Sequence, residues 1–241
     1  MNENILQLSG VHTHIGAYHI LHGVDLNVPK GRLTMLLGRN GAGKTTTLRT
    51  IMGLWRASAG RVVFNGQDIT KMPTPQISQL NVAYVPENMG IFSELTVKEN
   101  MLLAARWARN AAQIDQARLQ WIFSLFPAVE KFWNHPAGKL SGGQKQMLAV
   151  SRAIIEQREL LIVDEPSKGL APAIINNMID AFAQLKASGV TILLVEQNIN
   201  FAKRLGDSVA VMDNGQIVHS GSMKELAENE ELQHSLLGLA I

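Results

Sequence analysis

Hydrophobic and polar residues alternate along the chain in a pattern that predicts strands separated by helices. Residues 24–28 carry an apolar side chain at every second position, which is typical of a strand with one buried face. Residues 33–37, 160–163 and 191–195 are almost wholly apolar, as expected of strands that are covered on both faces of a parallel sheet. A hairpin is predicted at residues 209–218, because Asp-Asn-Gly lies between two apolar runs. Helices are predicted at residues 45–52, 173–187 and 223–236.

The middle of the chain is predicted to be helical throughout. Thr96 and Glu99 have the spacing of a capping box, which satisfies free N–H groups where a helix begins, and we expect this helix to extend to about Arg109. A second helix is predicted before Pro127, where apolar residues recur with helical spacing. The sequence therefore predicts an α/β core that is interrupted by a helical insertion at residues 88–158.

The composition of the chain excludes several classes of protein. The 241 residues include no cysteine, which excludes disulfide frameworks, thiolate metal sites and cysteine nucleophiles. Lys and Arg number 22 against 20 Asp and Glu, and no run of five basic residues occurs, so we do not expect nucleic acid as a partner. No stretch approaches the ~18 apolar residues that span a bilayer, and the amino terminus lacks the pattern of a secretory signal.

Four histidines near the amino terminus, His12, His14, His19 and His22, form a possible metal-binding group. No carboxylate or cysteine shares a ligand-like spacing with them, and the residues between them have the pattern of strand and loop. We therefore expect these histidines to be surface or packing residues.

A glycine-rich loop between a buried strand and a helix is the first candidate site. Its pattern, Gly-x-x-x-x-Gly-Lys-Thr ending at Thr45, is the Walker A sequence. In this arrangement backbone N–H groups surround phosphates, Lys44 reaches the outer phosphates, and the Thr45 hydroxyl binds Mg²⁺. The residues predicted to bind the nucleotide here are Gly38, Arg39, Asn40, Gly41, Ala42, Gly43, Lys44, Thr45 and Thr46.

Two carboxylates supply groups that a phosphate loop still lacks. Asp164 and Glu165 directly follow a buried strand, at the edge of the sheet where α/β proteins bind ligands. Asp164 is the candidate for holding the metal, and Glu165 is the candidate base that orients an attacking water.

A second helix start that suits an anion lies at Ser141. Ser141 and Gln144 have capping-box spacing, and the free N–H groups and dipole of a helix start favour negative charge. Gly142 and Gly143 would let a phosphate approach the backbone. A well-capped helix explains the two polar residues, but it does not explain why a second phosphate-ready helix start precedes Asp164.

These three motifs, in this order and spacing, resemble the nucleotide-binding subunit of ATP-binding cassette (ABC) transporters over essentially the whole chain. The resemblance implies a P-loop NTPase (RecA-like) α/β core with an antiparallel β subdomain and an inserted α-helical subdomain, in one ATP-binding domain at residues 1–241. It also implies that two such subunits face head to tail, with the signature residues of one completing the ATP site of the other. Those signature residues are Ser141, Gly142, Gly143 and Gln144.

Further strings resemble the LivF-type subunit of importers for branched-chain amino acids: Tyr84-Val-Pro-Glu87, Gln146-Met-Leu-Ala149, Glu165-Pro-Ser-Lys-Gly-Leu-Ala-Pro172 and Val195-Glu-Gln-Asn198. The implied cofactors are ATP and Mg²⁺. The implied partners are a second ATPase subunit, either LivG-like or another copy, two transmembrane permeases, and a periplasmic or external solute-binding protein. The implied location is the cytoplasmic face of the inner membrane, and the solute is left open.

Four positions depart from most ABC subunits. Glu87 replaces Gln, Gln197 replaces His, Ala171 replaces Asp, and Ile15 stands near the position where a stacking aromatic residue usually lies. By resemblance Glu87 is assigned to the catalytic and metal site, and Gln197 to the catalytic site. Gln197 cannot become a cation, so it can only form hydrogen bonds to the γ-phosphate, and we expect a slower or asymmetric site.

The stacking partner for adenine is open. Tyr18 is a candidate for the platform, and ordinary packing is the alternative for a tyrosine in this stretch.

Met89, Ile91 and Phe92 follow Glu87, in the region that forms the permease-binding groove in the family, and they are the candidates for an apolar socket. The alternative is that Ile91 and Phe92 belong to the core.

Two other functions are weighed against import: a soluble ABC-type ATPase that acts on the ribosome or DNA, and a regulatory cassette with a weak hydrolytic site.

Overall fold

The computed structural model describes residues 3–106, 108, 110 and 113–237. At its centre is a six-stranded sheet in the order β10-β9-β3-β8-β7-β6, in which only the β9–β10 hairpin is antiparallel. Its strands are β3 (Leu33–Leu37), β6 (Val82–Val85), β7 (Leu160–Asp164), β8 (Thr191–Glu196), β9 (Ser208–Asp213) and β10 (Gln216–Ser222). The predicted buried strands and the hairpin are thus confirmed.

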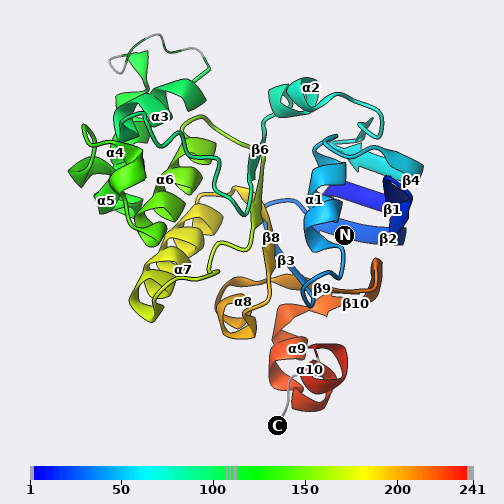
Figure 1. Ribbon diagram of the computed structural model, residues 1–241. Coiled ribbons are helices and arrows are strands. Elements are labelled where there is room, and N and C mark those ends of the chain that lie inside the picture. The colour runs from blue at the N-terminus through cyan, green and yellow to red at the C-terminus, as the bar shows by residue number, and fades with distance from the viewer. Residues whose placement is uncertain (1–2, 107, 109, 111–112, 238–241) are drawn as a thin grey trace.

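A second sheet is antiparallel throughout and lies beside the first, with helix α1 between them (Figure 1). Its order is β2-β1-β4-β5, with bounds β1 (Asn4–Ile15), β2 (Tyr18–Pro29), β4 (Ala57–Phe64) and β5 (Gln67–Asp68). The antiparallel subdomain that the resemblance implies is therefore present.

Helices cover the face of the central sheet that points away from the antiparallel sheet, and α3 to α6 gather on that side (Figure 1). The described helices are α1 (Lys44–Ile51), α2 (Thr74–Gln79), α3 (Val97–Ala104), α4 (Gln116–Leu125), α5 (Pro127–Lys131), α6 (Gly142–Ile154), α7 (Pro172–Ala187), α8 (Ile199–Leu205), α9 (Met223–Glu228) and α10 (Glu230–Leu237), with a 3-10 turn at Ala137–Lys139. Among the described residues, no helix is long and apolar enough to cross a membrane.

Two helix predictions are corrected. The helix that begins after Thr96 ends at Ala104, because Ala105 leaves helical geometry and the Arg106 backbone N–H donates to Glu156 Oε1 (2.6 Å) instead of to a helical carbonyl. Arg109, the predicted end, lies outside the described residues. The single helix predicted at 223–236 is two helices, because Asn229 leaves helical geometry and its side chain accepts the Leu232 N–H (2.9 Å) at the start of α10.

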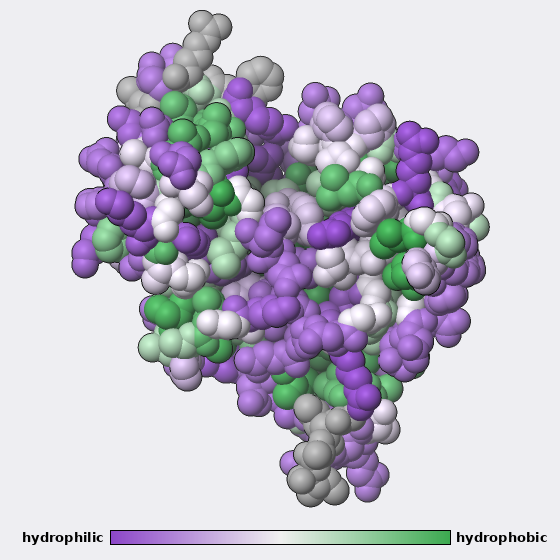
Figure 2. Space-filling view, viewed as in Figure 1, coloured by the Kyte–Doolittle hydropathy of each residue, from purple (hydrophilic) through white to green (hydrophobic). Residues whose placement is uncertain are grey.

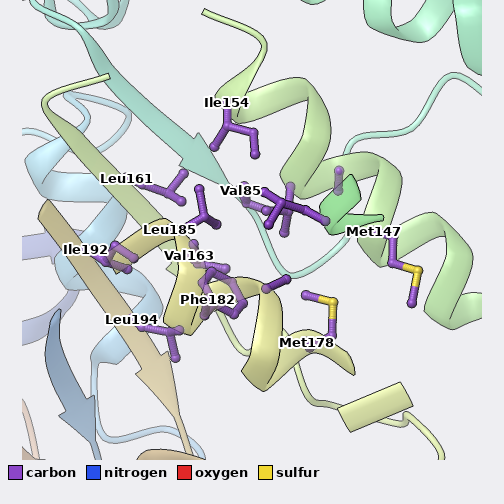
Figure 3. Close-up of a cluster of buried hydrophobic side chains, with 14 of the residues drawn as sticks. Val85, Met147, Ile154, Leu161, Val163, Met178, Phe182, Leu185, Ile192 and Leu194 are labelled. Carbon is purple, nitrogen blue, oxygen red and sulfur yellow. The ribbon is translucent and has the colours of Figure 1, made fainter. Parts of the chain in front are cut away.

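The core has two parts because alternate residues of each central strand point to opposite faces of the sheet. Figure 3 shows one part, where β7 and β8 side chains face residues of α6 and α7. Residues of this part include Met147, Ile154, Leu161, Val163, Phe182, Leu185, Ile192 and Leu194. The other part joins Ile162 and Leu193 to Leu48 of α1 and to the antiparallel sheet. Burying each large aliphatic side chain contributes roughly 1.5–3 kcal/mol, so both faces of this sheet stabilise it.

The strand order brings three loops to one edge of the central sheet. Neighbouring strands β3, β8 and β7 run parallel, with Leu37 paired to Glu196 and Asp164 paired to Val195. The carboxyl ends of the three strands therefore lie together, and so do the residues that follow them.

Candidate functional site

The glycine-rich loop joins β3 to α1 through backbone geometry that other residues cannot adopt. At Gly43, the residue before α1, φ is 108°, in the left-handed region. A Cβ atom on Gly38 would lie 2.3 Å from the Met212 carbonyl oxygen of β9. The two fixed glycines of the motif are thus required by the turn and by close approach to a neighbouring strand.

Lys44 is buried at the start of α1 and directs its ammonium back into the loop. Its Nζ donates to the Gly38 oxygen (2.8 Å) and the Arg39 oxygen (3.0 Å), and it lies 3.3 Å from Glu165 Oε1. The loop therefore holds a positive charge at the centre of the group of oxygen atoms that line it.

Glu165 lies just beyond β7 with a left-handed backbone (φ 48°), a conformation that costs energy for a residue with a side chain. Its Oε1 accepts from Gln197 Nε2 (2.6 Å), and the same amide nitrogen donates to Asn40 Oδ1 (2.8 Å). The structure thus brings together the loops after β3, β7 and β8, and Lys44, Asn40, Glu165 and Gln197 form one connected group.

Asp164 is 1% exposed and is incompletely satisfied. Its Oδ1 has no hydrogen-bond partner in the described part of the chain, and its Oδ2 lies 3.5 Å from the Tyr84 hydroxyl. Burial raises the pKa of Asp164, and a hydrogen bond from Thr45 partly opposes this. Burial, and then the charge of Asp164, raise the pKa of Tyr84 to about 12. A buried carboxylate oxygen without a partner, next to a threonine hydroxyl, fits a ligand pair for a hard cation.

Glu87 reaches the same place from the loop after β6. Its Oε1 lies 2.5 Å from Lys168 Nζ, which also lies 3.6 Å from Glu165 Oε2. The hydrogen bond to Glu87, followed by the charge of Glu165, raises the pKa of Lys168. These groups line a cavity of about 350 Å³ with the phosphate loop: Ile20, Asn40, Gly41, Gly43, Lys44, Thr45, Thr46, Glu87, Glu165 and Lys168.

Three residues of this region are not identified as site residues from the sequence. Ile20 and Lys168 line the cavity. Glu196, at the end of β8, is buried and accepts backbone N–H groups from Ser167 (2.9 Å), Gln197 (3.1 Å) and Asn198 (3.3 Å). Burial raises the pKa of Glu196, and those hydrogen bonds oppose the shift. The available signal is a glutamate at the end of a wholly apolar strand, which a buried position tolerates only with partners.

The signature residues begin α6 as the capping box predicts. Gln144 Oε1 accepts the Ser141 N–H (2.9 Å), and Ser141 Oγ accepts the Gln144 N–H (3.3 Å). Ser141 and Gly142 are exposed, and a Cβ on Gly142 would meet open space. Gly143 is buried, and a Cβ there would lie 2.7 Å from Ile174 of α7, so packing within the chain explains this glycine. None of these residues lines the phosphate cavity of its own chain.

The candidates for permease contact divide into two groups. Met89 lines a groove of about 690 Å³ between α6 and the loops near β6, and it packs against the core, as Ile91 does. Phe92 is 51% exposed, with the Arg152 guanidinium carbon 5.3 Å from its ring centroid. The interpretation of Phe92 as a core residue is therefore wrong, whereas Ile91 is half-buried against the core.

Four predicted nucleotide contacts are not among the residues that line the cavity: Gly38, Arg39, Ala42 and Tyr18. Tyr18 is 76% exposed at the start of β2, so the alternative that it packs in the core is wrong, but Ile20 and not Tyr18 lines the cavity. Arg39 directs its Nε to the Leu237 carbonyl of α10 (3.3 Å). In the view of Figure 2, hydrophilic residues run through the middle of the face, between the helical side and the antiparallel sheet.

The four histidines cluster on the paired strands β1 and β2 of the antiparallel sheet. The His14 and His19 rings stack with their centroids 4.1 Å apart, and the centroids of the His19 and His22 rings are 4.0 Å apart. His12 Nδ1 is 3.0 Å from His19 Nε2. Across residues 3–106, 108, 110 and 113–237, no group of three or more His, Asp or Glu side chains has the geometry to hold a metal ion.

Comparison with known proteins agrees with this arrangement. The family model described as ABC transporter matches residues 21–168. The chain is 37% identical to the high-affinity branched-chain amino acid transport ATP-binding protein BraG of Pseudomonas aeruginosa, over 97% of this chain and all of BraG. It is 35% identical to the probable branched-chain amino acid transport ATP-binding protein LivF of Archaeoglobus fulgidus, over 92% of this chain and 93% of LivF.

Solved structures of ABC transporter cassettes have the same fold as this chain. An ATP-binding subunit of an ABC transporter superposes with a TM-score of 0.82 at 28% identity, covering 97% of this chain and 96% of the other. An ATP-binding cassette in its ADP conformation superposes with a TM-score of 0.81 at 26% identity, covering 98% of this chain and all of the other. These relatives favour the transporter interpretation over an ATPase that acts on the ribosome or DNA.

Proposed function

The chain belongs to the ABC transporter family, and on this premise we propose that it is the ATP-hydrolysing subunit of an importer for branched-chain or other amino acids. The observation that supports this most is the contact of Glu165 with both Lys44 and Gln197 at the edge of the sheet. The names of the two importer subunits described above support the class of solute. In this proposal residues 1–241 form one ATP-binding domain, and residues 88–158 form its helical subdomain.

The phosphate loop binds ATP by exchanging partners. The backbone N–H groups at the start of α1 point toward the outer phosphates, and the helix dipole favours their charge. Lys44 gives up its bonds to two backbone carbonyls and donates to the β- and γ-phosphates instead. The exchange preserves the hydrogen bonds of a buried ammonium, so binding does not leave it unpaired.

Glu165 then acts on water. Its carboxylate orients the attacking water and accepts its proton as the bond from the water oxygen to the γ-phosphorus forms and the bond from that phosphorus to the β–γ bridging oxygen breaks, which releases ADP and phosphate. Gln197 keeps Oε1 of this base in place and is near enough to the phosphate loop to donate to the γ-phosphate. Because Gln197 carries no charge, it offers the transition state a dipole rather than a cation, and we propose that this site turns over slowly.

Mg²⁺ is the proposed metal. Asp164 Oδ1, buried and without a partner among the described residues, and the Thr45 hydroxyl would hold it, with Glu87 on the open side. When bound, the ion neutralises charge on the β- and γ-phosphates.

ABC ATPase cassettes act as dimers with membrane permease partners. We propose that exposed Ser141 and Gly142 of one subunit cover the phosphates held by the other, together with the helix start formed by Gly143 and Gln144. The second subunit would be LivG-like or another copy. Two permeases and an external or periplasmic solute-binding protein would complete the importer at the cytoplasmic face of the inner membrane, with Met89 and Phe92 near the permease contact.

Purification of the chain with its native partners tests this function. We expect two membrane permeases to copurify and phosphate to be released from ATP only with Mg²⁺. Lys44→Ala lowers the rate by about 100-fold, whereas Lys224→Ala, at an exposed site, does not. The ligand held by the copurifying solute-binding protein identifies the solute. Copurification of ribosomes or DNA in place of permeases contradicts the proposal.

A further inference from the structure

Lys168 joins two carboxylates of the phosphate cavity. Its Nζ lies 2.5 Å from Glu87 Oε1 and 3.6 Å from Glu165 Oε2, and all three residues line the cavity. The side chain is 53% exposed, but its backbone is held by two hydrogen bonds. The Lys168 N–H donates to the backbone carbonyl oxygen of Glu165 (3.2 Å), and the Ser167 N–H donates to the carboxylate of buried Glu196. The fold thus positions this ammonium next to the proposed base.

Two ammonium groups flank Glu165 from opposite oxygens. Lys44 lies against Oε1 at 3.3 Å, and Lys168 lies nearer Oε2. An ammonium has only three donor hydrogens, and Lys44 has to direct them to phosphates when ATP is bound. Lys168 is then the cation that remains to hold the carboxylate of Glu165.

The charges of the site make this role necessary. Asp164, Glu165 and Glu87 place three carboxylates around the position of the triphosphate, and only Lys44 and Lys168 oppose them among the residues that line the cavity. The Glu165 side chain is 7% exposed and that of Glu87 is 45% exposed, so water screens the repulsion between their carboxylates only in part. Without Lys168, Glu87 would repel Glu165 and displace it.

Glu87 is a suitable anchor because the segment that follows it is held by other contacts. The Met89 N–H donates to the Pro86 oxygen (2.8 Å), and Arg152 of α6 donates to the Gly90 oxygen (2.5 Å). The backbone that carries Glu87 is therefore held in a turn. Through its ion pairs with both carboxylates, Lys168 restrains Glu165 relative to this turn.

We propose that Lys168 is a positioning residue for ATP hydrolysis, which holds the base Glu165 at its working position through an ion pair with Glu87. The inference rests on the proposed function, in which Glu165 acts on water. It assigns Lys168 no contact with the reacting atoms.

A double-mutant cycle of phosphate release, measured on the assembled complex at varied ATP·Mg²⁺, tests this proposal. Lys168→Met is expected to lower kcat by about tenfold and to change KM by less than about threefold, because the phosphate loop still binds ATP. Lys168→Arg restores most of kcat, since it restores the charge. In a Glu87→Gln background, Lys168→Met changes kcat by less than about twofold, since the anchor is already lost.

Three results would overturn the proposal: an unchanged kcat in Lys168→Met, an equal loss in both backgrounds, or a raised KM with kcat intact. The half-exposed position makes a loss of folding unexpected, and unfolding temperatures within about 2 °C of wild type check this. If Lys168→Met does not fold, Lys168→Gln takes its place in the cycle. A wild-type complex that releases no phosphate contradicts the proposed function itself, and the role of Lys168 with it.

Discussion

Gln197 Nε2 lies 2.6 Å from Glu165 Oε1, and this contact connects the loops that follow β8 and β7. The same nitrogen donates to Asn40 Oδ1 of the phosphate loop at 2.8 Å. One uncharged amide thus links the proposed base to the loop that holds the phosphates. Because an amide has no proton to lose near neutral pH, the link works by geometry rather than by titration.

Removal of this amide is expected to slow hydrolysis more than it weakens binding. Gln197→Ala frees Oε1 of Glu165 and removes a donor to the γ-phosphate, so kcat should fall by about 10- to 100-fold. Binding of ATP should change by less than about threefold. Steady-state phosphate release and nucleotide titration measure the two effects. Asn200→Ala is the control, because it removes an exposed amide on α8 and leaves the Gln197–Glu165 bond in place; an equal loss of kcat in that variant would show that the Gln197 amide has no specific role.

Because this site is proposed to be slow, we also expect the two ATPase subunits to hydrolyse ATP at unequal rates. In the assembled complex, Glu165→Gln should lower phosphate release by less than about tenfold, because the site on the partner ATPase carries more of the turnover. Phosphate release and solute uptake are measured on the same preparation. Loss of all hydrolysis and transport would mean that this site is not the lesser one.

Glu196 predicts a pH dependence of stability. Burial raises its pKa above the ordinary 4.5, so the folded chain binds the proton more readily than the unfolded chain. The stability from this group is complete below pH 4.5 and is lost as the pH rises through the raised folded value. Relative to wild type, Glu196→Gln should therefore become more stable with rising pH across this window.

Denaturant unfolding at a series of pH values measures this difference. Glu228→Gln, at an exposed site on α9, is the matched control and should show no pH-dependent difference from wild type. The same flat result for Glu196→Gln would mean that burial does not shift this carboxyl group. Glu196→Ala, which leaves three backbone N–H groups without this acceptor, should lose about 1–3 kcal/mol of unfolding free energy below pH 4.5, and this loss should shrink as the pH rises through the folded pKa.

Phe92 tests the permease contact. It is half exposed, so Phe92→Glu should fold and bind nucleotide as wild type does, while transport is uncoupled from ATP hydrolysis. Leu103→Glu is the control, since Leu103 is an equally exposed apolar residue on α3. Uptake and phosphate release in proteoliposomes measure the coupling. Transport that survives in the Phe92 variant, or is lost equally in the Leu103 variant, contradicts this assignment.

Local patterns in the sequence predicted the buried strands, the hairpin and the glycine loop between a strand and a helix, because residues a few positions apart determine these features. The loop from Gly38 to Thr45, the acidic pair after β7 and the capping box at Ser141 each depend on residues a few positions apart. The break between α9 and α10 was missed because the side chain of one residue, Asn229, caps a new helix.

The remainder depends on distant pairs that no local pattern contains. Lys168 and Glu87 are 81 positions apart, and only the order of the parallel strands makes them neighbours. Gly143 was predicted to open the backbone to a phosphate, and its close packing on Ile174 of α7 follows from tertiary structure. Glu196 was missed because one of its partners, the Ser167 N–H, comes from the loop after the neighbouring strand β7.

In the proposed assembly, the helix beginning at Ser141 covers ATP held by another subunit. Light scattering of the Glu165→Gln variant, alone and mixed with its partner ATPase, measures this directly. We expect ATP with Mg²⁺ to double the mass in one of these samples, and an added Ser141→Arg substitution to prevent this association. An unchanged mass in both samples, or equal association with Ser141→Arg, would contradict the claim.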